Sequence, residues 1–145
     1  NAPDFTLPGA GERTISLLAL KGRWVVVYFY PKDDTPGCTT EAKDFTALAD
    51  AFADKSAHII GISKDRVAKH DKFRGKHELT VDLASDEDGA VCEAYGVWVE
   101  KKMYGKTYMG IQRATFLIAP DGKVSKVWPK VKVKGHAEDV LAAIA

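Results

Sequence analysis

A row of apolar and aromatic residues at positions 24–30 constrains the fold of this chain more than any other stretch. An unbroken row of β-branched and aromatic side chains favours a strand that is buried on both faces of a sheet. Two prolines and a glycine follow and end the strand. Between residues 39 and 53, apolar residues recur three and four positions apart, which predicts a helix. The sequence therefore predicts a strand, a loop and a helix, with Cys38 beside the helix start.

The predicted helix start has consequences for the Cys38 thiol. Free N–H groups and the helix dipole favour a thiolate there. A thiol of pKa ~8.5 is roughly 3% ionised at pH 7 and one of pKa ~6 about 90%, a gain of about 2 kcal/mol. Larger accelerations need donors aimed at the charge that develops in the transition state, and Thr35 and the loop N–H groups are candidates. The alternative is a buried structural cysteine at an ordinary strand-to-helix turn.

At this loop the chain resembles the peroxiredoxins. Pro31, Thr35 and Cys38 form a Pro-x-x-x-Thr-x-x-Cys pattern that is followed by Thr-Glu. The stretch Pro-Gly-Cys-Thr-Thr-Glu-Ala and the later Tyr95-Gly-Val-Trp98 are similar to the bacterioferritin-comigratory (Q-type) branch. The resemblance covers nearly the whole chain and implies a thioredoxin-like fold and a thiol peroxidase. Cys38 would attack the O–O bond of hydrogen peroxide or an organic hydroperoxide and become a sulfenic acid.

The resemblance also implies roles for other residues. Arg113 would face the peroxidatic sulfur, favour its thiolate and hold a peroxide oxygen. Pro31, Pro36 and Gly37 would support the active-site loop. Many Q-type relatives carry a resolving cysteine five residues after the peroxidatic one, where this chain has Lys43. The departure favours a one-cysteine cycle completed by an external thiol, such as thioredoxin, glutaredoxin, glutathione or another small thiol.

Cys92 is the second cysteine of the chain, and its apolar neighbours in a predicted helix favour a structural role. To resolve a sulfenic acid at Cys38, it would have to bring its Cα atom to about 4.4–6.8 Å from that of Cys38 after local unfolding. A two-cysteine cycle with a Cys38–Cys92 disulfide therefore stays open as the alternative.

Two other functions are weighed against peroxide reduction. A thiol-disulfide oxidoreductase of the same fold usually needs Cys-x-x-Cys, whereas this chain has Cys38-Thr-Thr-Glu41. Members of that class also tend to carry a proline before the strand where this chain has Arg113-Ala-Thr115. A nucleic-acid-binding module is the other candidate, because residues 100–135 hold nine basic and two acidic residues. The lysines at 130, 132 and 134 alternate with valines, however, which is typical of a solvated strand edge, so no nucleic-acid partner is expected.

The whole pattern predicts one α/β domain over residues 1–145, with a central mixed sheet flanked by helices and an N-terminal hairpin. The strand, helix and strand after the cysteine predict parallel pairing. In the helix expected at residues 64–76, Val67, Ala68 and Phe73 are expected to face inward. The other expected elements are a hairpin within residues 2–17, a helical turn at 17–20, strands at 57–63 and 79–84, helices at 64–76, 85–95 and 135–145, an extended, partly exposed connection at 97–108, and a hairpin of 113–119 and 123–128.

Composition limits the remaining possibilities. No apolar stretch approaches a membrane span and the start does not resemble a signal peptide, so a cytoplasmic protein without a membrane partner is expected. The two cysteines have no metal-ligand spacing, and neither a metal nor a cofactor is expected. A monomer or weak dimer is expected. The histidines are scattered, none adjoins the cysteine, and each is interpreted as buried or at the surface rather than as a catalytic base: His58, His70, His77 and His136.

Overall fold

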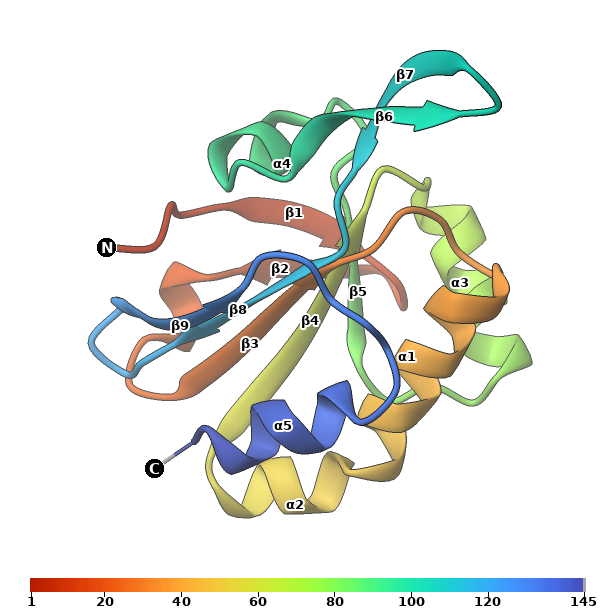
Figure 1. Cartoon of the computed structure of the whole chain (residues 1–145). Helices are drawn as coiled ribbons and strands as arrows, with labels where there is room; N and C mark the ends of the chain where they lie inside the picture. The colour runs from red at the N-terminus through yellow and green to blue at the C-terminus, as the bar shows by residue number, and fades with distance from the viewer. Residues whose placement is uncertain (145) are drawn as a thin grey trace.

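The computed structural model describes residues 1–144, which form a central mixed sheet with helices on both faces (Figure 1). The strand order in this sheet is β2-β1-β5-β4-β3-β8-β9. The strands of this sheet are β1 (Thr6–Gly9), β2 (Arg13–Ser16), β3 (Trp24–Phe29), β4 (Ala57–Ser63), β5 (Asp82–Ser85), β8 (Ala114–Ile118) and β9 (Val124–Trp128). The helices are the 3-10 turn η1 (Leu18–Leu20), α1 (Pro36–Ala47), α2 (Ala49–Asp54), α3 (Val67–Lys76), α4 (Ala90–Ala94) and α5 (His136–Ala142). The α/β architecture with its N-terminal hairpin is as predicted.

Strand β3 lies at the centre and is buried on both faces, as its composition predicts. It pairs in parallel with β4 and antiparallel with β8. Because successive side chains of a strand point to opposite faces, β3 contributes to two separate cores. Val26 and Tyr28 pack in the first core, against α1, α2 and α5. Val25, Val27 and Phe29 pack in the second core, which includes α4. Figure 1 shows α4 above the sheet and α2 and α5 below it.

The first helix differs from the prediction in its bounds. It begins at Pro36 rather than at residue 39, so Cys38 is its third residue. The proline suits this start because it has no N–H group to leave unpaired in the first turn. The helix also ends at Ala47, and α2 begins after Leu48, which leaves the helical conformation. The predicted helix is therefore two consecutive helices.

The predicted parallel unit is confirmed by the pairing of β3 with β4 and of β4 with β5. The prediction for the inward face of α3 is partly wrong. Phe73 is buried, but Ala68 is exposed and Val67 only partly buried. The polar His70 lies inward instead, because both nitrogens of its ring have buried hydrogen-bond partners. A count of apolar residues cannot detect such a position.

The stretch expected as an extended connection is a regular hairpin of β6 (Trp98–Met103) and β7 (Lys106–Ile111). Its turn consists of Tyr104 and Gly105, both at positive φ, which is the conformation of a type I′ hairpin turn. Tyrosine is an unusual residue at that position, so the turn gave no signal in the sequence. The hairpin projects from the body beside α4 (Figure 1).

Two smaller corrections concern the C-terminal third. Residues 129–135 are irregular, so the alternating lysines and valines are not on a strand. Helix α5 covers most of the predicted closing helix, whose last residue, Ala145, lies outside the described residues. Within residues 1–144, the structure contains no helix of the length and apolar character that crossing a membrane requires.

Candidate active site

Cys38 lies in the first turn of α1, directly after the loop that leaves the central strand. Thr35 precedes the helix in an extended conformation, and its carbonyl oxygen accepts the first helical hydrogen bond, from the N–H of Thr39 at 2.8 Å. The side chain of Cys38 packs in the first core with only 1% of the residue exposed. The sulfur is therefore at a helix N-terminus, but beneath the surface.

Arg113, the residue just before β8, contacts this sulfur. Its Nη2 donates to Cys38 Sγ at 3.2 Å, and its Nη1 donates to Glu41 Oε1 at 2.6 Å. The residue directly precedes β8, whose pairing with β3 carries it to the end of the strand where α1 begins. Gly37 leaves room for the guanidinium, since a Cβ there would lie 3.2 Å from Nη2. The structure thus brings Cys38 and Arg113 into direct contact.

Glu41 is a site residue that the sequence analysis did not assign. Only 1% of it is exposed, and its Oε2 has no hydrogen-bond partner within residues 1–144. Burial raises the pKa of Glu41 to about 7, although the charge and hydrogen bond of Arg113 oppose this shift. Burial lowers the pKa of Arg113, but the charges of Glu41 and Cys38 outweigh it and raise that pKa. Arg113 is therefore shared between a buried carboxyl and the sulfur.

Thr35 lies three residues before Cys38 in the chain, and its hydroxyl group is used inside the loop. Oγ1 donates its proton to the carbonyl oxygen of Lys32 at 2.8 Å. A hydroxyl has one proton and two lone pairs, so this bond leaves the oxygen of Thr35 free to accept a hydrogen bond. The expectation that Thr35 donates to the developing charge therefore needs a rotation of the hydroxyl.

The loop before α1 is attached to α3 and to the end of β4 through Asp33. This residue is 2% exposed and accepts hydrogen bonds from Tyr30 Oη and His70 Nδ1, both at 2.5 Å. Its own N–H donates to Asp65 Oδ2 at 2.7 Å. The sequence analysis gave these residues no role because they lie far apart in the chain.

The next loop residue, Asp34, binds the C-terminal end of α3. It adopts a positive φ of 62°, which asparagine and aspartate tolerate better than most residues. Lys76 Nζ and His77 Nε2 donate to its two carboxylate oxygens at 2.8 and 2.9 Å. These hydrogen bonds lower the pKa of Asp34.

Cys92 occupies a different place from Cys38. It is fully buried in α4, in the second core, so the sheet separates the two sulfurs. Its N–H donates to Asp86 Oδ2 at 2.7 Å, and burial together with this carboxylate raises the pKa of its thiol. Both thiols are free. The structure does not bring Cys92 to the candidate site.

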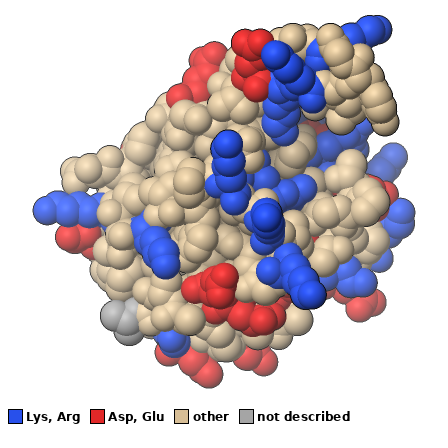
Figure 2. Space-filling view, viewed as in Figure 1, with Lys and Arg blue, Asp and Glu red and all other residues tan. Residues whose placement is uncertain are grey.

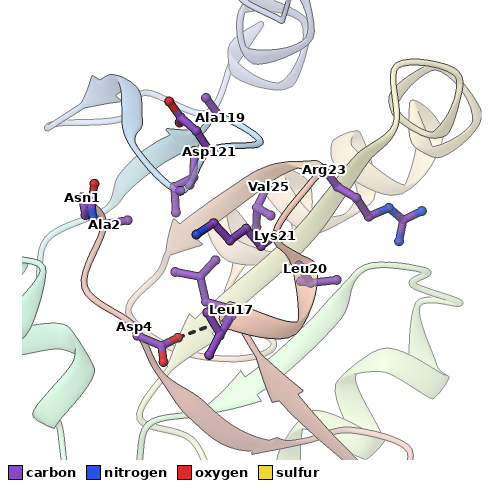
Figure 3. Close-up of a pocket in the computed structure, with 13 residues that line it drawn as sticks. Asn1, Ala2, Asp4, Leu17, Leu20, Lys21, Arg23, Val25, Ala119 and Asp121 are labelled. Atoms are coloured by element: carbon purple, nitrogen blue, oxygen red, sulfur yellow. Dashed lines mark hydrogen bonds between the residues drawn. The ribbon is translucent and has the colours of Figure 1, made fainter.

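Cys38 belongs neither to a group of possible metal ligands in the described residues nor to the lining of the cavity beside η1. Asp33, Asp65 and His70 place ligand atoms within 4.8 Å of one another, but His70 Nδ1 is hydrogen-bonded to Asp33 Oδ2, and Asp65 Oδ2 accepts a hydrogen bond from the backbone N–H of Asp33. A cavity of about 190 Å³ lies elsewhere, with apolar walls that include Leu17 and Val25 (Figure 3). None of the predicted site residues lines this cavity.

Comparisons with known proteins agree with this geometry. A family model described as the AhpC/TSA family matches residues 1–127. Peroxiredoxin Bcp of Xanthomonas campestris is 50% identical over 97% of this chain and 88% of its own length, and Peroxiredoxin Bcp of Bacillus subtilis is 49% identical over 99% and 91%.

Solved structures give the same result. The Xanthomonas campestris bacterioferritin comigratory protein, whose structures were described for its alkyl peroxide reduction activity, superposes with a TM-score of 0.92 at 49% identity over 97% of this chain and 89% of that one. A Mycobacterium tuberculosis peroxidoxin BcpB reaches a TM-score of 0.86 at 37% identity, over 99% and 92%. The chain therefore belongs to the AhpC/TSA family, within the Bcp or Q-type branch of the peroxiredoxins.

Proposed function

We propose that this chain reduces organic hydroperoxides and hydrogen peroxide, with Cys38 as the attacking sulfur. The observation that carries the proposal is the contact of Arg113 Nη2 with Cys38 Sγ at 3.2 Å in the first turn of α1. A guanidinium and a helix N-terminus both favour a thiolate over a thiol. The relative described for alkyl peroxide reduction supports an organic hydroperoxide as one substrate.

In the proposed reaction the thiolate attacks the terminal oxygen of the peroxide. A sulfur–oxygen bond forms, the O–O bond breaks, and the leaving alkoxide or hydroxide takes up a proton, which yields a sulfenic acid and an alcohol or water. Negative charge moves from the sulfur to the leaving oxygen during this step. Arg113, whose Nη2 contacts the sulfur and whose side chain is 16% exposed, presents a fixed positive charge beside the reacting atoms. In the proposed reaction this charge stabilises the transition state to the extent that the guanidinium binds the peroxide oxygens more strongly as they become negative.

Thr35 is proposed to orient the peroxide. With its proton donated to the Lys32 carbonyl, its oxygen accepts a hydrogen bond from the peroxide O–H group. Pro36 and Gly37 support the site by setting the helix start and by admitting the guanidinium. Pro31 is proposed to support the loop at its beginning.

The second half of the cycle is proposed to use an external thiol. Cys92 is buried behind the sheet, and its raised thiol pKa disfavours the thiolate that such an attack requires. Thioredoxin, glutaredoxin, glutathione or another small thiol is the proposed reductant, in a reducing compartment such as the cytoplasm. A Cys38–Cys92 disulfide is the alternative, and it would require α4 or α1 to unfold locally.

The proposal is tested by replacing each cysteine and following peroxide consumption with several thiol reductants. Cys38→Ser is expected to abolish turnover, whereas Cys92→Ser, the matched control, is expected to retain activity near that of the wild type. Mass spectrometry after one equivalent of peroxide should show the gain of one oxygen atom on Cys38. Substantial turnover by Cys38→Ser would overturn the central claim. Loss of turnover in Cys92→Ser, with the oxygen adduct trapped, would identify Cys92 as the resolving residue.

A further inference from the structure

The burial of Cys38 permits its proposed reaction with a small peroxide but hinders the later reaction of its sulfenic acid with a reductant. A peroxide is small, whereas the reductant carries its thiol on a larger molecule and must attack the sulfur of the sulfenic acid directly. With 1% of Cys38 exposed, such an attack requires the loop and the first turn of α1 to move away from the body of the protein. The contacts that hold this loop therefore affect the two half-reactions differently.

Two adjacent aspartates hold the loop, and they differ in burial. Asp33 is inside, bonded to Tyr30 and His70, and its removal would leave buried polar groups without partners. Asp34 is outside, with its side chain 40% exposed. It is bound by Lys76 and by His77, both at the C-terminal end of α3. The outer contact thus ties the loop to the C-terminal end of α3, the helix whose His70 also holds Asp33.

We propose that the contacts of Asp34 with Lys76 and His77 hold the Cys38 loop in its closed, peroxide-reactive form and thereby slow the access of the reductant. This inference rests on the proposed function. Asp34 touches neither the sulfur nor the substrate, so it is a positioning residue. Its contacts oppose the opening of the loop without contributing to the reaction in the closed state.

The consequence is a competition at the sulfenic acid. In the productive step a reductant thiolate attacks the sulfur, a disulfide bond forms, the S–O bond breaks, and hydroxide leaves and takes up a proton. In the competing step a second peroxide molecule transfers one oxygen to the sulfur, which gives a sulfinic acid and an alcohol or water. A tighter outer contact favours the second outcome because it keeps the loop closed.

The test uses Asp34→Asn in the full chain, since asparagine tolerates the positive φ at this position. Removal of an exposed ion pair is expected to increase the opening equilibrium about two- to fivefold. The reductant step, measured by mixing pre-formed sulfenic acid with thiol, should accelerate by that factor, and the fraction of sulfinic acid at a fixed peroxide concentration should fall. The peroxide step should stay within about twofold of the wild type.

Glu87→Gln is the matched control, because it removes one exposed carboxylate near the other end of α3, 3.9 Å from Arg66, and leaves the loop untouched. It should change neither step. The double variant Asp34→Asn with Lys76→Gln should behave like Asp34→Asn alone, as expected for residues that act through one contact. A reductant step unchanged in Asp34→Asn, or equally changed in Glu87→Gln, would overturn the proposal.

A peroxide-independent measurement separates this proposal from the proposed function. In a Cys92→Ser background, the rate at which iodoacetamide alkylates reduced Cys38 reports loop opening directly. Asp34→Asn should raise this rate about two- to fivefold, even if the protein turned out not to reduce peroxide. An unchanged alkylation rate would refute the closing role of Asp34, whatever the peroxidase activity.

Discussion

Replacing Glu41 with glutamine should change how the stability of the protein depends on pH. Glu41 is buried beside Arg113, and its pKa of about 7 lies well above its ordinary value of 4.5. The folded protein therefore binds a proton at this carboxyl more tightly than the unfolded chain does. Stability falls with rising pH wherever the folded state binds more protons, so this contribution is lost between about pH 4.5 and pH 7.

The expected size follows from the shift. For each pH unit between the two pKa values, the free energy of unfolding falls by about 1.36 kcal/mol. The range from pH 5 to pH 7 contains roughly two such pH units. Between pH 5 and pH 8 the wild type should therefore lose about 2 to 3 kcal/mol of unfolding free energy relative to Glu41→Gln. Glutamine keeps an oxygen that accepts the hydrogen bond from Arg113 but does not titrate.

The measurement is urea denaturation of both proteins, reduced and without peroxide, at pH 5, 6, 7 and 8. Any constant offset between the two proteins reflects the altered hydrogen bonds of the glutamine and is removed by comparing slopes against pH. Titrating groups that contact neither Glu41 nor Arg113 are the same in both proteins, so they cancel in the difference. Parallel curves over this range would show that the carboxyl titrates normally, and the account of a buried Glu41 sharing Arg113 would then be wrong.

Three other substitutions test the hydrogen bonds of the site and of the first core. Arg113→Met should lower the second-order rate constant with peroxide by about 10- to 150-fold, because it removes a hydrogen bond that involves a charged group. Thr35→Val should lower the same constant by about tenfold, because it removes a hydrogen bond between neutral groups. Stopped-flow fluorescence measures both constants. Losses that merely follow the thiolate fraction in a thiol titration would contradict a role in the transition state. Tyr28→Phe should raise the unfolding free energy by about 1 kcal/mol, because the buried hydroxyl of Tyr28 has no partner within residues 1–144. A destabilised Tyr28→Phe would show that the hydroxyl does have a partner.

The parts of the fold that the sequence predicted are those with strong local patterns. The apolar row of β3 and the apolar spacing of α1 predicted the strand, the loop and the helix around Cys38. The β6–β7 hairpin was missed because its strands are rich in lysine and its turn uses Tyr104 at positive φ. No local pattern distinguishes such a hairpin from an exposed connection.

The site was predicted where the resemblance supplied residues and was missed where contacts are distant in the chain. Asp33 and His70 are 37 positions apart, and nothing in either neighbourhood indicates that they meet. Glu41 is part of the motif, yet its sequence position is that of an ordinary acid near a helix start. Only the approach of Arg113 from β8 makes it a buried, shared partner.

Because side chains alternate along β3, the sheet separates two cores, and the two thiols of the protein lie in different cores with different accessibility. Cys38 becomes reachable when one loop opens, whereas Cys92, behind the sheet in the second core, becomes reachable only when the packing of that core is lost. The alkylation rate of Cys92 therefore measures the opening of the second core, while that of Cys38 measures the opening of the active-site loop. A single sample with a thiol reagent and mass spectrometry can follow both events, so each variant of the loop can be checked for an effect confined to the active site.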